Sequence, residues 1–386
     1  MKYHKVGDLR LSRIGLGCYA LSGAYGAVDT AGFESTLRAA IEQGVNFFDT
    51  AEGYGDAETF LGQVLAPVRD RVYIATKLSG TGGQPDLSAG AVRLACQASL
   101  RRLGTEVIDL YQIHFDDPHT PVLETVSALE DLVKEGLIRH YGVSHLPINR
   151  VGAYAEAGNL FSILMELSPV ARGALDTLLP ICEQHNLAAI AFSVTGRGIL
   201  SGHFESGHHF GEGDIRRMDP LFKRERFDAA VRVREHLAKL GEAYGATAVQ
   251  IGIAWVLAQP QVACALTGTS SPTHLAENLA ASEINLAQEH LDTLNAFLAQ
   301  EDRRLAAVQR VTVRQILERP LVADLEAAFN DLVYVMETAM SLGMAEEGAV
   351  MATFLELFSL RGALDENAQR QMQGIQQYLR GMLIGD

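Results

Sequence analysis

The sequence predicts an α/β protein with a parallel sheet, and two patterns support this prediction. Short apolar runs alternate with stretches of helical periodicity over roughly residues 1–300. Several runs end directly on a polar residue, a pattern typical of buried parallel strands. We expect strands near residues 14–18, 46–49, 73–77, 109–113, 140–143, 163–166, 188–192 and 263–267. Eight strands joined by helical crossovers match a closed (β/α)8 barrel of the TIM type, whereas a doubly wound open sheet would usually have about five to seven.

The N-terminal segment predicts a β-hairpin that plugs the floor of the barrel. Residues 2–12 alternate between apolar and polar side chains and turn at Gly7-Asp8. Helical patterns then fill the intervals between the strands. They include residues 31–43, 89–103, 122–134 and 250–259.

Beyond residue 302 the pattern becomes wholly helical. Apolar residues recur at helical spacing over residues 321–344, 346–361 and 366–384. We therefore divide the chain into a barrel, residues 1–301, and an all-helical appendage, residues 302–386, that we expect to form a small antiparallel bundle. The stripe of Met and Phe side chains in the appendage favours an ordinary core, with a binding groove as the alternative.

Composition and charge exclude several classes of protein. The 386 residues carry a formal net charge of −15, which argues against a nucleic-acid surface, because such a surface needs clustered Lys and Arg. The sequence has no apolar stretch of about 18 residues, and its N-terminus lacks the apolar centre of a signal peptide. We therefore expect a cytoplasmic protein without membrane contact. The cysteines are scattered, and we expect them to be buried free thiols.

A long polar loop at residues 203–226 interrupts the barrel pattern. It contains His203, His208 and His209 together with several glycines. The sequence offers no Cys or carboxylate cluster to complete a metal site around these histidines, so no metal is predicted. We expect a mobile loop that covers a functional site, because long loops in compact domains often serve as lids.

Three of the predicted strands end on groups that suit proton transfer. The apolar runs lead into Asp49, Lys77 and His114, and Tyr54 follows the first of them in Gly53-Tyr54-Gly55. These side chains should meet, because right-handed crossovers bring the carboxyl ends of all strands to one face. A nearby ammonium favours ionisation of a phenol, whose ordinary pKa is about 10, and a carboxylate keeps that ammonium charged. The set predicts catalysis in which Tyr54 exchanges a proton and His114 donates to a substrate oxygen.

Further short motifs follow one another along the chain in a recognisable order. They are Gly15-Leu16-Gly17, Phe48-Asp49-Thr50-Ala51-Glu52-Gly53-Tyr54-Gly55, Ala75-Thr76-Lys77, Asp109-Leu110-Tyr111-Gln112-Ile113-His114, Gly142-Val143-Ser144, and Gly268-Thr269-Ser270-Ser271 with Glu277-Asn278. In this order and spacing the chain resembles the aldo-keto reductases, nicotinamide-dependent carbonyl reductases built on a (β/α)8 barrel. The resemblance covers roughly residues 1–300 and leaves residues 302–386 without a recognised counterpart.

The resemblance implies a role for each member of the polar set. Tyr54 would be the general acid in reduction and the base in oxidation, and Lys77 would lower its pKa. Asp49 would pair with Lys77, and His114 would orient the carbonyl oxygen. The implied cofactor is NADPH, with NADH as the alternative.

The residues expected to surround the nicotinamide depart from the family's pattern. Ser144 matches the serine that holds the carboxamide, but His145 follows it where Asn is usual. Leu164 stands where Gln is usual. Leu167 stands at the position that we expect to stack on the nicotinamide, where an aromatic residue is usual. An aliphatic side chain lacks the stacking contribution of about 0.5–1.5 kcal/mol.

The remaining cofactor contacts come from two later segments. The segment from Phe192 to Gly198 matches the one that covers the pyrophosphate, and the loop after the last strand has free N–H groups that can bind phosphate. By resemblance, the expected contacts are Ser193, Thr195 and Arg197 at the pyrophosphate, Gly268 in the phosphate loop, Ser270 and His274 at the adenosine 2′-phosphate, and Glu277 and Asn278 at the adenine.

Three functions remain open at the level of the sequence. The first is NADPH-dependent reduction of an aldehyde, a ketone or a sugar-like carbonyl. The second is a cofactor-sensing or partner-binding regulatory protein on the same fold, with the C-terminal helices binding a protein partner or a second copy of the chain. The third is an NAD-dependent sugar dehydrogenase that uses the same catalytic set in the oxidative direction.

Overall fold

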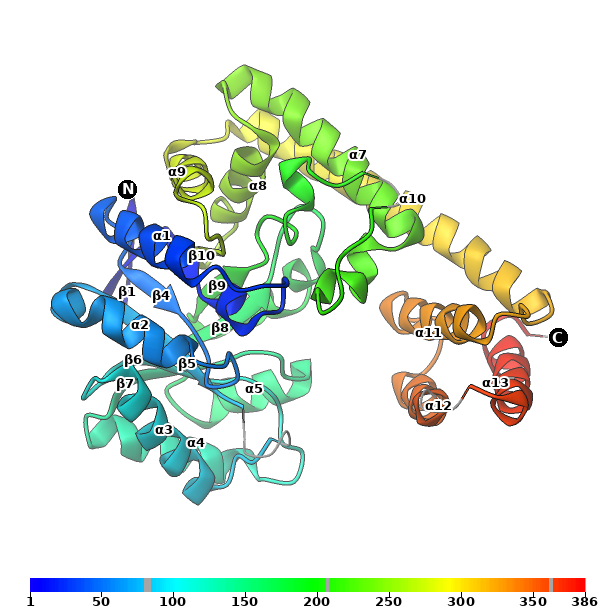
Figure 1. The fold of residues 1–386 in the computed structure, drawn as a ribbon, viewed down its shortest axis with the longest axis horizontal. Coiled ribbons are helices and arrows are strands. Elements are labelled where there is room, and N and C mark those ends of the chain that lie inside the picture. The colour runs from blue at the N-terminus through cyan, green and yellow to red at the C-terminus, as the bar shows by residue number, and fades with distance from the viewer. Residues whose placement is uncertain (80–84, 206–207, 361–363, 386) are drawn as a thin grey trace. The chain divides into compact units, whose positions relative to one another are not determined.

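The computed structural model describes residues 1–79, 85–205, 208–360 and 364–385. The chain forms two compact units, Met1–Leu294 and Asn295–Asp386. Figure 1 shows the fold, and each unit is described by itself.

The first unit is a closed barrel of eight parallel strands, as the sequence predicts. Going around the barrel, the strands follow the order β10-β3-β4-β5-β6-β7-β8-β9. Their bounds are β3 (Ile14–Gly17), β4 (Phe47–Asp49), β5 (Tyr73–Leu78), β6 (Ile108–Ile113), β7 (Ile138–Val143), β8 (Ser162–Glu166), β9 (Ala188–Phe192) and β10 (Val262–Thr267). Every position of β6 and of β10 is buried, which explains why these strands read as continuous apolar runs with few polar residues.

Helices connect the strands and surround the barrel (Figure 1). They are α1 (Thr30–Glu42), α2 (Ala57–Leu65), α3 (Ala89–Leu103), α4 (Val122–Lys134), α5 (Ile148–Ala157), α6 (Leu178–His185), α7 (Arg224–Gly241), α8 (Ala248–Leu257) and α9 (Pro272–Ala280). Capping contacts at the N-terminal ends explain where two of these helices begin. Ser88 caps α3 by accepting a hydrogen bond from the N–H of Ala91, and Thr247 forms a capping box with Gln250 at the start of α8.

The predicted hairpin closes the floor of the barrel. It consists of β1 (Tyr3–Val6) and β2 (Leu9–Ser12), which pair antiparallel. Leu9 and Leu11 are fully buried in a cluster with side chains from the barrel interior, Phe47 and Leu110 among them. The hairpin therefore adds its apolar face to the barrel core.

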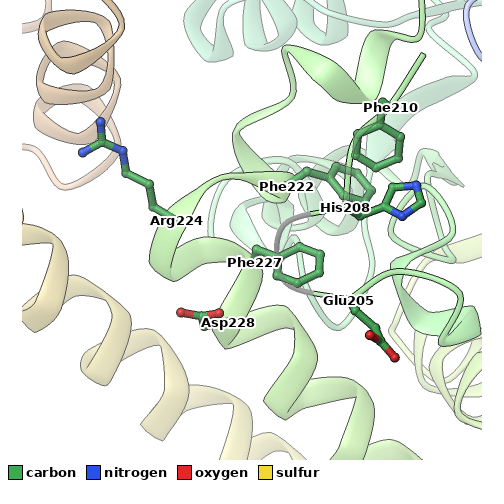
Figure 2. Close-up of a pocket in the computed structure, with 7 residues that line it drawn as sticks. All are labelled: Glu205, His208, Phe210, Phe222, Arg224, Phe227 and Asp228. Atoms are coloured by element: carbon green, nitrogen blue, oxygen red, sulfur yellow. The ribbon is translucent and has the colours of Figure 1, made fainter. Parts of the chain in front are cut away.

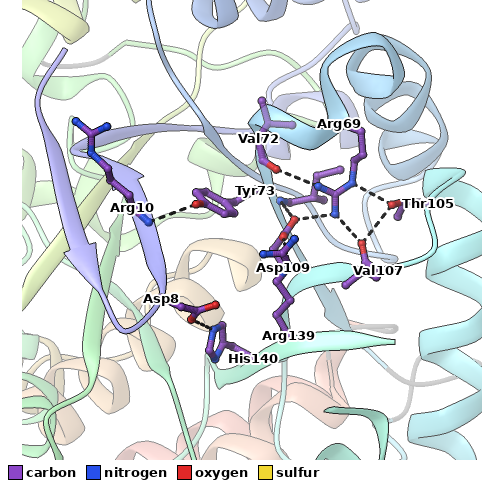
Figure 3. Close-up of polar contacts among 11 residues, drawn as sticks. Asp8, Arg10, Arg69, Val72, Tyr73, Thr105, Val107, Asp109, Arg139 and His140 are labelled. Carbon is purple, nitrogen blue, oxygen red and sulfur yellow. Dashed lines mark hydrogen bonds and ion pairs between the residues drawn. The ribbon is translucent and has the colours of Figure 1, made fainter. Parts of the chain in front are cut away.

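Polar contacts hold the floor together (Figure 3). Asp8, at the turn of the hairpin, lies 2.7 Å from Nε2 of His140 in β7. The buried carboxylate of Asp109 is paired with Arg69 at 2.7 Å and with Arg139 at 3.1 Å. It also accepts the backbone N–H of Ile74 at 2.9 Å. Asp109 therefore has a structural role at the opposite end of β6 from His114.

The second unit is helical and has its own core. It contains the later part of α10 (Gln288–Glu318) together with α11 (Leu325–Ser341), α12 (Glu347–Ser359) and α13 (Glu366–Leu383). Buried side chains from these helices, such as Val313, Leu332 and Met372, form one apolar cluster. The prediction of an ordinary core for the Met and Phe stripe agrees with this cluster for most of its members, whereas Met351 is 40% exposed. Residue 361, the predicted end of the second helix, lies outside the described residues.

The boundary between the two units differs from the one that we expected. It falls between Leu294 and Asn295, inside α10, and not at residues 301 and 302. Because α10 is continuous from Gln288 to Glu318, the helical pattern has no break there that could mark a boundary in the sequence. Among the described residues, no helix is both long enough and apolar enough to cross a membrane.

Candidate active site

The polar set gathers at the carboxyl ends of the barrel strands. Asp49 is the last residue of β4, Lys77 is next to last in β5, and His114 directly follows β6. Parallel pairing places Gly17 beside Asp49 and Lys77 beside Gln112, so these strand ends lie at one edge of the sheet. Tyr54 lies in the turn between β4 and α2.

Lys77 and Asp49 form a buried ion pair. Lys77 Nζ lies 2.5 Å from Asp49 Oδ1, and the two side chains are 1% and 7% exposed. The ammonium also donates to the backbone carbonyl of Thr50 at 2.7 Å, while Gln112 Nε2 donates to Asp49 Oδ2 at 3.2 Å. Burial alone would lower the pKa of Lys77, but Asp49 and Tyr54 outweigh it and raise this pKa above its ordinary value. Lys77 therefore stays charged inside the protein.

Tyr54 lies beside this ion pair. Lys77 Nζ is 5.1 Å from the centroid of the Tyr54 ring. Backbone hydrogen bonds from Tyr54 N–H to Ala51 and from Ala57 N–H to Tyr54 hold the turn that presents the ring. Burial raises the pKa of the Tyr54 hydroxyl, and the Lys77 ammonium only partly opposes that rise. The net direction is opposite to the lowered pKa that we expected, so Tyr54 is a protonated phenol at neutral pH.

His114 completes the set as a neutral imidazole. Its ring centroid is 5.7 Å from that of Tyr54, and the residue is 6% exposed. Burial, together with the charge of Lys77 and the neighbouring His145, lowers the pKa of His114 to about 2. Ser79 Oγ lies 2.7 Å from Nδ1 of His114. The structure thus brings together all four residues singled out in the sequence, and Ser79 is an additional contact that no sequence motif indicated.

Aromatic rings form a continuous band around this group. Successive ring centroids along the band are between 4.3 and 5.7 Å apart. The band consists of Tyr19, Tyr25, Tyr54, His114, Phe115, His145 and Phe192. Most of these rings come from the segments that follow β3, β4, β6 and β7. Phe115 was missed in the sequence, although it directly follows the predicted site residue His114. Phe192 was expected only as the first residue of the segment at the pyrophosphate.

Ser144 and His145 contact each other at the end of β7. Ser144 Oγ lies 2.7 Å from Nδ1 of His145, and Ser144 is buried whereas His145 is exposed. A serine hydroxyl can donate one hydrogen bond and accept others, so this contact leaves Ser144 able to bind a second polar group.

Leu164 and Leu167 are both buried. Leu164 packs in the barrel interior with Leu9 and Leu11. Leu167 is fully buried, so it offers no surface on which a nicotinamide ring could stack. The partly exposed ring nearby is Phe192, whose backbone carbonyl accepts the N–H of Leu167 at 3.2 Å. The expectation that Leu167 faces the cofactor does not fit this burial. Its register against Phe192 is set by β8–β9 pairing, which the local sequence does not reveal.

The segment after β9 has an unusual backbone. Ser193, Gly196, Arg197 and Gly198 all have positive φ, between 52° and 92°. Only glycine adopts this region without strain, so Ser193 and Arg197 are held there by their surroundings. The Arg197 guanidinium is paired with Glu166 at 3.2 Å and also with Asp219. Its charge is therefore balanced within the protein.

The predicted phosphate loop lies between β10 and α9. Gly268, Ser270 and His274 are exposed, and Ser271 caps α9 by accepting the N–H of His274 at 3.4 Å. Asn278 is buried in the same helix, and Glu277 accepts the Thr247 hydroxyl at 2.7 Å. The exposed members of this loop are available to a ligand, whereas Glu277 and Asn278 are engaged in packing the helix.

The loop at residues 203–226 packs on its own aromatic side chains. Arg216 lies over the rings of Tyr25, Phe204 and Phe210, at 4.9 to 5.1 Å from their centroids. The N–H of Ile215 donates to the carbonyl of Ala24 at 2.7 Å, which ties this loop to the one after β3. Ser206 and Gly207 lie outside the described residues. Over the parts of the chain that are described, no group of His, Cys, Asp and Glu side chains could hold a metal ion.

A separate pocket lies between this loop and the start of α7 (Figure 2). Its lining residues are Glu205, His208, Phe210, Phe222, Arg224, Phe227 and Asp228. None of the polar set at the strand ends lines this pocket, so it is distinct from the candidate active site.

Comparisons with known proteins agree with this geometry. The model of the Aldo/keto reductase family matches residues 13–299. An aldo-keto reductase of Strobilurus tenacellus, str7, is 33% identical over 302 residues, covering 74% of this chain and 89% of the relative. The aldo-keto reductase YhdN of Bacillus subtilis is 32% identical over 287 residues, covering 71% and 87% of the two chains.

Solved structures give the same result. The glycerol dehydrogenase AKR11B4 from Gluconobacter oxydans has a TM-score of 0.71 and 29% identity, covering 78% of this chain and 96% of its own. An aldo-keto reductase from Klebsiella pneumoniae in complex with NADPH has a TM-score of 0.61 and 30% identity, covering 77% and 95%. The family model, these relatives and the closed parallel barrel all lead to one assignment. The chain belongs to the aldo/keto reductase family of oxidoreductases.

Proposed function

We propose that the protein reduces a small carbonyl compound with NADPH and that Tyr54 supplies the proton. The observation that carries this proposal is the position of Tyr54, beside a buried Lys77–Asp49 pair and within ring contact of His114. A protonated phenol next to a fixed positive charge is suited to give up its proton to a developing alkoxide.

The residues at the strand ends fit a nicotinamide dinucleotide. The hydroxyls of Ser193 and Thr195 and the exposed loop at Gly268 and Ser270 are donors of the kind that bind phosphate oxygens. His274 is exposed beside this loop, where it could meet the 2′-phosphate that distinguishes NADPH from NADH. Ser144 keeps hydrogen-bonding capacity for the carboxamide, and the partly exposed Phe192 ring is a better stacking surface than Leu167.

Each member of the polar set then has a defined task. When bound, the reduced nicotinamide supplies a hydride to the carbonyl carbon. Tyr54 donates its hydroxyl proton to the carbonyl oxygen, which gives the alcohol, and Lys77 stabilises the phenolate that remains. Asp49 keeps Lys77 charged, and His114 donates a hydrogen bond to the carbonyl oxygen. Tyr54 recovers its proton from water after the product leaves.

The aromatic band indicates the class of substrate. Phe115 is 43% exposed and stacks on His114 at 4.3 Å, so a flat apolar surface borders the reacting atoms. Such a surface favours an aldehyde or ketone whose carbonyl carries an aromatic or other apolar group over a polyhydroxylated sugar. A glycerol dehydrogenase shares this fold, so polyols are the comparison substrates of choice.

Substitution of Tyr54 tests the proposal. Tyr54→Phe should lower turnover of an aromatic aldehyde with NADPH by about a hundredfold or more, because it removes the proton donor but keeps the ring. Binding of NADPH, followed by fluorescence titration, should persist. Tyr19→Phe is the matched control, since its ring also packs on Tyr54 at 4.9 Å, and it should stay near wild type.

Two results would contradict the proposal. Near-normal turnover by Tyr54→Phe would remove Tyr54 from the reaction. A wild-type protein that binds NADPH but turns over neither aromatic aldehydes nor polyols would favour the regulatory alternative.

A further inference from the structure

The hydrogen bond between Ser79 and His114 bears on which ring nitrogen of His114 carries the proton. A neutral imidazole has one N–H, on Nδ1 or on Nε2, and the partner of one nitrogen decides the state of the other. His114 is buried and close to the Lys77 ammonium, so it remains neutral over the pH range in which proteins are folded. The contact at Nδ1 therefore bears on whether Nε2 carries the proton and can donate a hydrogen bond.

The partner at Nδ1 is the Ser79 hydroxyl, at 2.7 Å. A hydroxyl can either donate its hydrogen to Nδ1 or accept a hydrogen from it. Only donation by the hydroxyl makes Nδ1 the acceptor and leaves the single ring proton on Nε2. Donation to Nδ1 is thus the arrangement in which His114 can donate a hydrogen bond from Nε2.

The backbone of Ser79 is fixed relative to the turn that carries Tyr54. The N–H of Ser79 donates to the Glu52 carboxylate, and the N–H of Glu52 donates to the carbonyl of Lys77 at 3.2 Å. Glu52 also lies 3.7 Å from Arg102 of α3. Lys77, Ser79 and the Tyr54 turn are therefore held in one arrangement by reciprocal contacts.

Gly53 makes room for this arrangement. A Cβ atom on Gly53 would lie 3.3 Å from Ser79 Oγ, closer than an ordinary contact. The absence of a side chain at position 53 lets the Ser79 hydroxyl approach the turn without a clash. Glycine at position 53 is therefore favoured for a steric reason as well as for its backbone freedom.

We propose that Ser79 is a positioning residue for His114: its hydroxyl donates to Nδ1 and leaves the ring proton on Nε2, from which His114 donates to the carbonyl oxygen of the substrate. In the opposite tautomer Nε2 would be an acceptor and would repel that oxygen. The inference rests on the proposed function, because it assumes that His114 contacts the substrate. Ser79 itself does not touch the reacting atoms.

Histidine nitrogen NMR is the direct test, because the two ring nitrogens of a neutral imidazole have different signals when protonated and when not. Wild-type protein labelled with ¹⁵N-histidine should show His114 with its proton on Nε2, and His114→Gln identifies the signal by its loss. Ser79→Ala should shift His114 toward a mixture of the two tautomers. Ser79→Thr, which keeps the hydroxyl, should restore the wild-type signal.

Kinetics provide the second measurement. Ser79→Ala should lower kcat for carbonyl reduction by about three- to tenfold, the loss expected for one ordinary hydrogen bond, with the NADPH affinity unchanged. Ser79→Thr should recover most of this loss. A purely structural role would lower the fraction of active protein without moving the His114 tautomer.

The outcomes separate this inference from the proposed function. A wild-type His114 that carries its proton on Nδ1, or a His114 signal that is unchanged in Ser79→Ala, overturns the inference whether or not the protein reduces carbonyls. The wild-type spectrum decides the tautomer even if Ser79→Ala does not fold. Unimpaired turnover by Tyr54→Phe would instead overturn the proposed function and would leave the tautomer measurement valid.

Discussion

At the scale of single residues, the charge on Lys77 depends on a small number of partners. Its ammonium is almost wholly buried and has two close oxygen partners, Asp49 Oδ1 and the carbonyl of Thr50. Taking an ion out of water costs several kcal/mol, and that cost is offset only while both members of the pair are present. Lys77, which we propose to stabilise the Tyr54 phenolate, is therefore also a residue whose partners the fold cannot lose without cost.

Substitution of one member of this pair should lower the free energy of unfolding more than substitution of both members. Asp49→Asn should lower the free energy of unfolding by about 3–5 kcal/mol, because it leaves the Lys77 charge buried and unpaired. The double variant Asp49→Asn/Lys77→Met should recover a large part of that loss. Urea unfolding followed by circular dichroism measures all three proteins.

An exposed ion pair provides the control for this comparison. Arg93 and Glu135 are paired on the surface at 2.6 Å, and Arg93→Ala should leave the free energy of unfolding almost unchanged. If the double variant at Asp49 and Lys77 were no more stable than Asp49→Asn, the unpaired charge of Lys77 would not be the source of the cost.

At the scale of elements, the hairpin of β1 and β2 should matter for stability and not for chemistry. Leu11→Ala removes a fully buried side chain from the floor cluster and should cost about 2–5 kcal/mol in the free energy of unfolding. The strand ends that carry Tyr54 and Lys77 lie at the other end of the barrel, so kcat for carbonyl reduction at 25 °C should stay near wild type.

The matched control for the hairpin is the exposed Lys5 of β1. Lys5→Ala should leave the urea midpoint almost unchanged. A large fall in kcat for folded Leu11→Ala would show that the floor and the catalytic face are coupled through the strands, contrary to this expectation.

The elements also show which features the sequence predicts and which it does not. The barrel strands were predictable because short apolar runs alternate with helical patterns, and several of these runs have a polar end, as in the run before Asp49. The polar set of Asp49, Tyr54, Lys77 and His114 was predictable from the same pattern, since parallel strands bring their carboxyl ends together. Contacts between side chains that follow different strands, such as Ser79 after β5 with His114 after β6, leave no local signal. The burial of Leu167 and the exposure of Phe192 depend on β8–β9 pairing for the same reason.

At the scale of the whole molecule, the chain divides into two compact units. The floor cluster of the barrel and the cluster of the second unit share no residue, although α10 contributes to both compact units. Separate clusters of this kind allow the two units to unfold separately, whereas a continuous helix would tend to couple them. The single tryptophan of the chain, Trp255, is buried in α8 of the first unit and so reports on that unit alone.

We expect the two units to melt independently. Leu332→Ala removes a fully buried side chain of α11 and should destabilise the second unit by about 2–5 kcal/mol. Far-ultraviolet circular dichroism should then show part of the helical signal melting at a lower temperature, while the transition followed by Trp255 fluorescence stays in place. Leu355→Ala, at a position of α12 that is 64% exposed, is the control and should change neither transition. If the Trp255 transition moved together with the helical signal in Leu332→Ala, the two units would form one cooperative structure joined through α10, and the helical unit could then not be removed without loss of the barrel.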